Sequence, residues 1–377
     1  MHDEFKILHV VSAPAAGGIE VYAKQLAAEF RRLGHRPVVA FVGHAADHGR
    51  SQEFEDEYLR ELETAGVEYF FIGDLSRRFP PIGAWRIWRY CRSNAIDIYH
   101  SHLVLGILFG FLLRIPRFHS HHSSVIRLPS WGYRLLNPLV DHYIAISRAC
   151  ADLLERSTGR RVAMIRNGID IARFAGRVRR GSKAIVQCIC VGRIVEAKNY
   201  PLLLDSIALA RDSGSDAFRV KIVGEGQPQL VARLEREIRE RGLASRVELL
   251  GNRVDVPELL GQSDLFVMSS AWEGLPISLI EATASGLPFI ATDVGGCREL
   301  AYLCGNGVIV TPGDAQALAG ALAALVEDCG RRAALSEAAL ANAGKLSIEA
   351  AADEHLRLYA AAMADRCDAA AEPSACG

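Results

Sequence analysis

The sequence lacks several features that would assign it to a familiar class of protein. Its nine cysteines form no Cys-x-x-Cys pair, and an odd, scattered set favours free thiols in a reducing cytoplasm over a disulfide scaffold. The longest apolar run, Leu103 to Leu113, is too short for a membrane span, which needs about 20 residues. The acidic first residues lead into only a short apolar run, so no signal peptide is expected. The absence of Gly-x-Gly-x-x-Gly disfavours a nicotinamide dehydrogenase.

The sequence as a whole has no marked excess of positive or negative charge, but one region of it is strongly basic. The net charge of −1 argues against general nucleic-acid binding. The segment from Arg77 to Arg177, however, contains sixteen arginines and only five acidic residues. Aromatic residues are interleaved with the arginines over 77–134. Arginine with tryptophan suits peripheral contact with an anionic membrane or a pyrophosphate lipid. It equally suits a soluble surface whose long side chains cover apolar groups, so both interpretations stay open.

The 377 residues are enough for two domains, and the first half begins like a nucleotide-binding unit. A buried strand is predicted over 6–11, then a loop containing Gly17 and Gly18, a helix ending near Gly34, and a strand over 38–42. A glycine pair lets the backbone approach a ligand closely. A loop that merely requires positive φ would use the same residues, and the spacing alone does not separate the two explanations.

Histidines gather where two later strands of the first half are predicted to end, a place where ligands collect in open α/β sheets. They are His100, His102, His119, His121 and His122. Structural or surface histidines and a polar sugar-binding cluster are both consistent with this pattern. A metal site is disfavoured, because no His-x3-His helix or cluster of carboxylates accompanies the histidines.

The second half starts near residue 180, after a basic linker over 173–183. A buried strand over 184–191 leads into a loop with Arg193 and Lys198, which can converge on one phosphate or remain as solvated basic residues. Arg253 and Val254 follow a further strand at 247–251.

One stretch organises this second half: a strand over 265–268, a loop, a helix from Ile277 that stops at Gly286, and a strand over 289–292. Glu273 lies on the loop and Glu281 on the helix. The helix N-terminus attracts anions such as a diphosphate, so a carboxylate beside it fits sugar hydroxyls. Two solvated glutamates are the plainer alternative.

The residues around these two carboxylates form a specific sequence motif. The stretch from Glu273-Gly-Leu-Pro to Glu281-Ala-Thr-Ala-Ser-Gly286, with Gly295-Gly296 and Glu299 after it, closely resembles the E-x7-E region of retaining glycosyltransferases of family 4. Gly17-Gly18-Ile19-Glu20 and Gly192-Arg193-x4-Lys198-Asn199 match motifs of the same family, and the resemblance extends over essentially the whole chain.

The resemblance implies an α/β protein of the GT-B fold, with two Rossmann-like domains facing a cleft. We expect an acceptor-binding domain over 1–180 and a nucleotide-sugar-binding domain over 181–347. A helix over 348–366 would cross back onto the first domain, and 367–377 would form a disordered tail.

The implied activity is transfer of a hexosyl group from a UDP-sugar or GDP-sugar to a saccharide or lipid-linked acceptor, with retained configuration and no obligatory metal or other cofactor. Bacterial surface polysaccharide or glycolipid assembly, in the cytoplasm or at the inner face of its membrane, is the expected setting. Alternatives are a nucleotide-sugar epimerase, a phosphorylase-like GT-B enzyme, or a non-catalytic nucleotide-sugar-binding subunit.

The resemblance also implies residue roles. His122 and Glu273 are the catalytic candidates, while His102 and Glu20 belong to the acceptor side. The donor-binding candidates are Gly17, Gly18, Arg193, Lys198, Gly224, Arg253, Val254, Gly274, Leu275, Pro276, Ile277 and Glu281. No double-displacement nucleophile and no metal ligand are assigned. The family's usual Glu-Gly-Phe-Gly reads Glu273-Gly274-Leu275-Pro276 here, which changes the groups available to contact the sugar.

Overall fold

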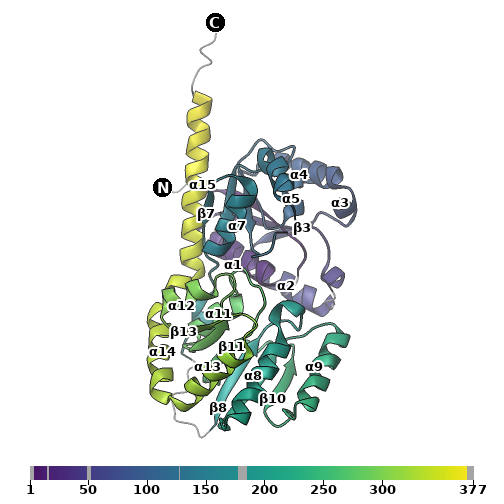
Figure 1. Ribbon diagram of the computed structural model, residues 1–377. Helices are drawn as coiled ribbons and strands as arrows, with labels where there is room; N and C mark the ends of the chain where they lie inside the picture. The colour runs from purple at the N-terminus through teal and green to yellow at the C-terminus, as the bar shows by residue number, and fades with distance from the viewer. Residues whose placement is uncertain (1–3, 15–16, 49–51, 127, 177–184, 372–377) are drawn as a thin grey trace. The chain divides into compact units, whose positions relative to one another are not determined.

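The chain folds into two compact units in the computed structural model, which describes residues 4–14, 17–48, 52–126, 128–176 and 185–371 (Figure 1). Unit 1 comprises residues 1–122, 126–168 and 348–377, and unit 2 comprises 123–125 and 169–347. Each unit is built on its own sheet and is described by itself.

Unit 1 contains a seven-stranded sheet in the order β3-β2-β1-β4-β5-β6-β7, with parallel pairing throughout. Its strands are Lys6–Val11 (β1), Arg36–Phe41 (β2), Glu68–Phe71 (β3), Ile98–Ser101 (β4), Arg117–His121 (β5), His142–Ala145 (β6) and Val162–Met164 (β7). The order reverses between β1 and β4, which is where ligands bind in sheets of this kind. The first predicted strand, over 6–11, coincides with β1.

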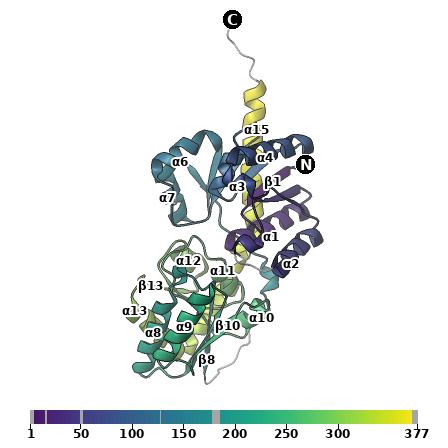
Figure 2. The ribbon, with the colours of Figure 1, turned by 90° about the vertical axis from the view of Figure 1, so that its right-hand side faces the viewer.

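Helices cover both faces of this sheet, as Figure 2 shows. They are Gly18–Arg32 (α1), Gln52–Thr64 (α2), Leu75–Arg78 (α3), Pro80–Asn94 (α4), Val104–Phe109 (α5), Ser130–Leu136 (α6) and Arg148–Thr158 (α7). Side chains of β2 alternate between two cores: Val38 and Ala40 join one, while Val39 and Phe41 join the other with Tyr58 of α2. Burial on both faces explains why these strands read as nearly continuous apolar runs.

The last helix, Ile348–Ala371 (α15), belongs to unit 1 and packs against α1. This return to the first unit was predicted from the resemblance. The helix continues to Ala371 rather than ending at Arg366, because the alanine-rich sequence after Arg366 contains no glycine or proline before residue 373. The expected disordered tail is therefore wrong for 367–371, and 372–377 lie outside the described residues.

Unit 2 contains a six-stranded parallel sheet in the order β10-β9-β8-β11-β12-β13. Its strands are Val186–Val191 (β8), Phe218–Val223 (β9), Val247–Gly251 (β10), Leu265–Met268 (β11), Phe289–Thr292 (β12) and Gly307–Val310 (β13). The strands predicted over 265–268 and 289–292 coincide with β11 and β12.

The helices of unit 2 alternate with its strands. They are Tyr200–Asp212 (α8), Pro228–Glu240 (α9), Val256–Gly261 (α10), Ile277–Ala284 (α11), Cys297–Cys304 (α12), Ala315–Glu327 (α13) and Cys329–Asn342 (α14). A single large core unites α8, α9 and α13 with the central strands. Three short 3-10 turns lie in or near the functional loops: Ile171–Arg173 (η3), Glu196–Lys198 (η4) and Ala343–Leu346 (η5).

The junction between the units lies earlier than the predicted residue 180. Ile169 donates its backbone N–H to the carbonyl of Leu346 at 3.0 Å and pairs with Ser347, so η3 packs against η5 inside unit 2. Residues 169–176 therefore belong with the second domain. Of the predicted linker over 173–183, residues 177–183 lie outside the described residues.

Candidate active site

The loop after β8 places the predicted donor-site cations. Gly192 follows the strand, η4 carries Lys198, and Asn199 adopts a left-handed conformation, with φ of 46°, to start α8. The hydroxyl of Tyr200 donates to the carbonyl of Gly192 at 2.7 Å and closes the loop onto the first turn of α8. A side chain at Gly192 would meet Cε of Lys198 at 2.6 Å, so the lysine lies directly over the glycine.

Lys198 and Glu273 are brought together, although the sequence analysis gave them separate roles. The Nζ atom of Lys198 lies 2.7 Å from Oε1 of Glu273, and both side chains are only 15% exposed. Ser270, which no motif singled out, donates its hydroxyl to the same carboxylate oxygen at 2.7 Å. The backbone N–H of Ala271 donates to the carbonyl of Ala197, which ties the two loops together. In the ligand-free protein, the cation of Lys198 is thus paired with the carboxylate of Glu273.

Glu281 lies on α11, which begins at Ile277 immediately after Pro276. The side chain is partly buried, and burial raises the pKa of its carboxyl to about 7. The positive charges of Arg173 and Lys198 act in the opposite direction. Arg173 was assigned to the linker in the sequence analysis; its role near Glu281 depends on the packing of η3 and had no local sequence signal.

Close backbone approach explains two glycines of this site. Gly295 has φ of 54°, and a Cβ there would lie 2.2 Å from the carbonyl oxygen of Glu273. Its neighbour Gly296 donates its N–H to the carbonyl of Gly274 at 2.7 Å. The loop after β12 therefore packs directly against the backbone of the Glu273 loop, a contact called the Gly295 clamp below. Gly224 plays the same part after β9: its φ is 147°, and a Cβ would lie 2.0 Å from the oxygen of Gly192.

The other predicted donor residues are arranged around this centre. Leu275 and Pro276 are buried beneath the loop, whereas Arg193 is exposed on the loop after β8. The guanidinium of Arg253 forms two hydrogen bonds with the carboxylate of Asp255, at 2.7 and 2.6 Å, so its charge is partly neutralised locally. Val254 beside it is 76% exposed.

In unit 1, Gly17 and Gly18 stand at the start of α1, with Gly17 as the N-cap residue. Glu20 in the first turn of α1 folds back so that a Cβ on Gly17 would lie 2.1 Å from its Oε2. Ser12 donates its hydroxyl to Oε1 of Glu20 at 2.5 Å. An acid in this position favours the helix N-terminus, so Glu20 has a structural role whatever ligand it meets.

The predicted histidines form part of a buried chain in unit 1. His102 lies between two others: its Nε2 is 3.0 Å from Nδ1 of His9, and its Nδ1 is 3.0 Å from Nε2 of His122. His100 stacks on His102 with ring centres 4.3 Å apart and contacts Tyr359 of α15 and Ser120 through its two nitrogens. His9 was missed, because a lone histidine in an apolar strand reads as a core residue.

Burial determines the protonation of these hydrogen-bonded histidines. It lowers the pKa of His9 and of His122 to about 3 each, with His121 adding to the effect on His122. Burial, and then the other histidines, hold the pKa of His102 and of His100 well below the ordinary value. These imidazoles are therefore neutral near pH 7, and each offers one N–H and one lone pair.

A metal ion would disturb this network. His9, His100 and His102 each bring one nitrogen within 4.8 Å of the others. However, both nitrogens of His100 and both of His102 already have hydrogen-bonding partners at 2.6–3.0 Å. Coordination would break at least two of those bonds in a fully buried site.

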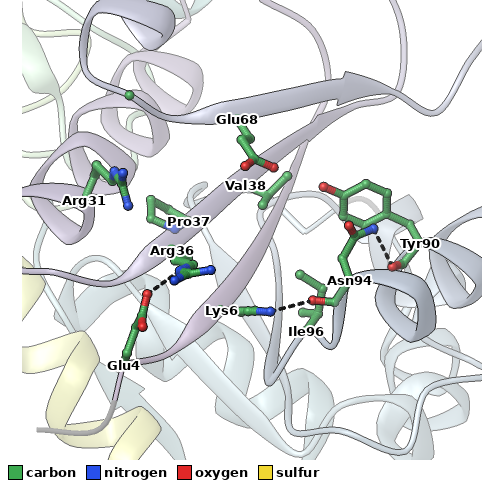
Figure 3. Close-up of a pocket in the computed structure, with 11 residues that line it drawn as sticks. Glu4, Lys6, Arg31, Arg36, Pro37, Val38, Glu68, Tyr90, Asn94 and Ile96 are labelled. Atoms are coloured by element: carbon green, nitrogen blue, oxygen red, sulfur yellow. Dashed lines mark hydrogen bonds and ion pairs between the residues drawn. The ribbon is translucent and has the colours of Figure 1, made fainter.

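A cavity of about 340 Å³ lies at the opposite, amino-terminal edge of the unit 1 sheet (Figure 3). Two of its charged groups have partners: Arg36 pairs with Glu4, and Lys6 donates to the carbonyl of Asn94. The cavity lies where β1 begins, at Lys6, whereas His102 and His122 follow the carboxyl ends of β4 and β5. This cavity is therefore not part of the candidate site.

Comparison with known proteins agrees with the chain's architecture. Residues 16–173 match Glycosyltransferase Family 4, and residues 180–341 match Glycosyl transferases group 1. The lipopolysaccharide core biosynthesis mannosyltransferase LpsB of Rhizobium meliloti is 28% identical over 69% of this chain and 77% of its own length. The Escherichia coli UDP-Gal:alpha-D-GlcNAc-diphosphoundecaprenol alpha-1,3-galactosyltransferase is 25% identical over 87% of this chain and 89% of its own.

Solved structures share the fold. The glycosyltransferase from Rickettsia africae superposes with a TM-score of 0.80 and 19% identity, covering 96% of this chain and 99% of that one. Anabaena Alr3699/HepE, in complex with UDP and glucose, gives a TM-score of 0.78 and 22% identity, covering 95% and 100%. The predicted pair of Rossmann-like domains is thus confirmed, and the protein is an enzyme of the glycosyltransferase class. From its two matched halves, the chain belongs to family 4 of the glycosyltransferases, the group 1 glycosyl transferases, and has the GT-B fold.

Proposed function

We propose that this protein transfers a hexosyl group from a nucleotide-diphosphate-sugar to an acceptor hydroxyl with retained configuration, in the assembly of a bacterial surface polysaccharide or glycolipid. Unit 2 would bind the donor and unit 1 the acceptor. The observation that carries the proposal is the Lys198–Glu273 pair, held at 2.7 Å beside the start of α11.

The donor's diphosphate is expected to replace Glu273 as the partner of Lys198. A diphosphate carries more charge than one carboxylate, and the first N–H groups of α11 favour an anion there. Arg193, exposed on the same loop as Lys198, adds a second cation. Together they would stabilise the charge that develops on the leaving diphosphate, so the proposed reaction needs no obligatory metal.

Release from Lys198 would leave Glu273 free to accept hydrogen bonds from hydroxyls of the transferred sugar. Glu281 would accept from the ribose, and the backbone near Arg253 and Val254 would meet the base. Gly224, Gly274, Leu275, Pro276 and Ile277 shape the backbone around these groups, and Gly17 and Gly18 would present the start of α1 to the phosphates.

On the acceptor side we propose His122, with His102 and Glu20 behind it. His122 is partly exposed at the carboxyl end of β5, and His102 and Glu20 are buried. Retention is proposed to occur on one face of the sugar, with the leaving phosphate taking the acceptor proton. No side chain is assigned as a nucleophile.

The donor and acceptor classes are proposed from similarity. HepE was solved with UDP, and the Escherichia coli relative is named for UDP-galactose and a diphosphoundecaprenol-linked sugar. We therefore place a UDP-sugar ahead of a GDP-sugar, and a lipid-linked saccharide ahead of a free one. Among the described residues, no helix is long and apolar enough to cross a membrane.

We further propose that unit 1 contacts an anionic membrane from the cytoplasmic side. Leu75 of α3, Trp85 of α4 and Phe79 between the two helices are each about half exposed, at 48%, 50% and 49%. The guanidinium of Arg78 lies over the ring of Phe79, and that of Arg89 over Trp85, at 5.9 and 5.7 Å. Apolar rings flanked by cations suit the headgroup region of anionic lipid. Arg127, part of the same basic region in sequence, lies outside the described residues.

The proposed function is tested by thermal shift and calorimetric binding with UDP-, GDP-, ADP- and dTDP-sugars, followed by transfer assays with the sugar that binds. We expect selective binding of one nucleotide, lost in Arg193→Ala, and a product of retained anomeric configuration by NMR. EDTA should leave the rate unchanged.

Other outcomes separate the alternatives. Epimerised donor formed without acceptor would favour the epimerase, and phosphate-dependent cleavage would favour a phosphorylase. Binding without turnover, with the lipid-linked acceptors supplied, would favour the non-catalytic subunit, whereas absence of binding to every donor would contradict the donor site itself.

A further inference from the structure

The His9–His102–His122 chain has only two internally consistent arrangements of protons. Each imidazole is neutral near pH 7, as the burial of all three rings requires, so His102 must donate from one nitrogen and accept at the other. Either His122 donates through His102 towards His9, or His9 donates through His102 towards His122. The tautomers of all three residues are therefore coupled by two hydrogen bonds of 3.0 Å.

The ends of the chain decide which arrangement is favoured. Nε2 of His9 and Nδ1 of His122 are buried atoms without a hydrogen-bonding partner among the described residues. His9 is fully buried, with its ring stacked on Phe30 at 5.7 Å between centres, so its Nε2 is not exposed to solvent. His122 is partly exposed at the end of β5. Each arrangement leaves one N–H without a partner, either at Nε2 of His9 or at Nδ1 of His122. An unpaired N–H is more costly in the fully buried His9 than in the partly exposed His122, so the proton belongs at the His122 end.

The same closed end excludes proton transport. A proton taken up at His122 could pass through His102 to His9, but Nε2 of His9 has no hydrogen-bonding partner in the described part of the chain to receive it. It would leave an imidazolium in the core beside Phe30 and His100. The chain can therefore fix a tautomer but cannot conduct protons away from a reaction.

We propose that His102 is a positioning residue, which donates from Nδ1 to Nε2 of His122 and so holds His122 with its proton on Nδ1. His122 is then a hydrogen-bond donor towards the acceptor side, rather than a base. Its importance for transfer rests on the proposed function, but the tautomer itself does not. His9 secures the direction by donating to Nε2 of His102.

The tautomer is measured directly in the ligand-free, full-length protein labelled with ¹⁵N-histidine, by long-range ¹H–¹⁵N correlation spectra. Signals of His122 are identified by their disappearance in His122→Gln. We expect a pyrrole-type Nδ1 and a pyridine-type Nε2 for His122. A pyridine-type Nδ1 in the wild-type protein overturns the proposal, and that result needs no variant to fold.

Two variants of equal shape test the control exerted by position 102. The side-chain amide of His102→Asn can still donate from the place of Nδ1, whereas the ionised carboxylate of His102→Asp can only accept. We expect the Asn variant to keep the proton of His122 on Nδ1 and the Asp variant to move it to Nε2. The same tautomer in both variants would overturn the proposal. Any imidazolium in the Asp variant shows two pyrrole-type nitrogens, and the pH is raised until that form is gone.

Transfer rates separate this role from a structural one. We expect the Asp variant to lose at least about 100-fold in kcat and the Asn variant to keep most of it, with similar KM for the donor. Equal losses in the two variants, despite opposite tautomers, would contradict the positioning role. Failure of the proposed function would show instead as no transfer in the wild-type protein with the expected tautomer present, so the two failures are distinguishable.

Discussion

Lys198 and Glu273 form a partly buried ion pair, with Nζ and Oε1 2.7 Å apart and each side chain 15% exposed. Two elements far apart in sequence hold it: η4 after β8 and the loop after β11. The pair orients both groups before any ligand arrives, and Ser270 donates its hydroxyl to the same carboxylate oxygen, Oε1. In the proposed reaction the diphosphate replaces Glu273 as the partner of Lys198, so the pair holds this cation in position until a donor binds.

Replacing Lys198 by alanine should impair catalysis much more than folding. The change removes the cation that we propose to bind the leaving diphosphate, and we expect kcat/KM for transfer to fall by about 100- to 1000-fold. Binding of UDP alone, measured by calorimetry, should weaken as well, because the diphosphate loses a partner even without the sugar. Lys345→Ala is a matched control, since Lys345 is an exposed lysine of unit 2 whose Nζ donates to the carbonyl of Leu303 at 3.4 Å. Near-normal turnover in Lys198→Ala would sink the donor-site assignment.

Donor affinity should depend on the ionisation of Glu281. Burial raises the pKa of its carboxyl to about 7, so the free enzyme carries it protonated below pH 7 and ionised above. In the proposed donor site, ribose hydroxyls donate to the ionised form of Glu281, and binding should therefore lower this pKa. We expect the Kd for a UDP-sugar to weaken by up to about tenfold per pH unit as the pH falls below 7.

Glu281→Gln isolates this effect, because the amide does not titrate. Its donor affinity should be lower than wild type at pH 8 and nearly flat between pH 8 and 6. A UDP-sugar is the right ligand, since its diphosphate diester has no titration in this range. The stability of the free proteins gives a second check. The raised pKa of Glu281 costs stability, in full above pH 7 and by a declining amount as the pH falls from 7 towards the ordinary value of 4.5, so the variant's advantage in Tm should shrink over that range. Parallel pH profiles for the two proteins would contradict the assignment.

The sequence was enough to predict the strand, loop and helix around Glu273. Apolar runs mark β11 and β12, and Pro276 and Gly286 bound α11, so local chemistry determines these elements. Contacts between residues on neighbouring strands could not be predicted from the sequence in the same way. His9 meets His102 only because β1 pairs with β4, in a register that sets His9 opposite His100. Neither the pairing nor the register of strands about 90 residues apart leaves a trace in the local pattern.

Roles that depend on packing were likewise hidden. Arg173 reads as a linker residue, yet η3 packs on η5 and brings its charge near Glu281. Lys198 and Glu273 were both singled out from the sequence, but their pairing was not predicted, since each was assigned to a different part of the donor. Motifs identify residues that a family needs, whereas the partners of those residues in the unliganded protein follow from the loops' three-dimensional approach.

Membrane contact should depend on the aromatic residues of α3 and α4. We expect the wild-type protein to sediment with vesicles containing phosphatidylglycerol, increasingly so at low salt, and to ignore vesicles of phosphatidylcholine alone. The double change Phe79→Ser with Trp85→Ser should reduce partitioning by about tenfold, since it removes two rings able to enter the headgroup region. Tyr302→Ser is the control, because Tyr302 is an aromatic residue of unit 2 that is 93% exposed. Equal partitioning of the double variant and the wild type would rule out this surface.

The Gly295 clamp should be essential for the shape of the donor site. A Cβ at Gly295 would lie 2.2 Å from the carbonyl oxygen of Glu273 and 2.5 Å from that of Gly274, both backbone atoms that cannot turn aside. Gly295→Ala must therefore displace the Glu273 loop, in addition to the cost of a left-handed alanine, about 1–2 kcal/mol.

Gly313→Ala is the control: Gly313 has a similar φ of 78°, with nothing within 4 Å of its Cβ position. We expect both variants to lose Tm, but only Gly295→Ala to lose donor binding by tenfold or more in calorimetry. Equal donor affinity in the two variants would show that the loop after β12 supports the fold of unit 2 and has no part in positioning Glu273.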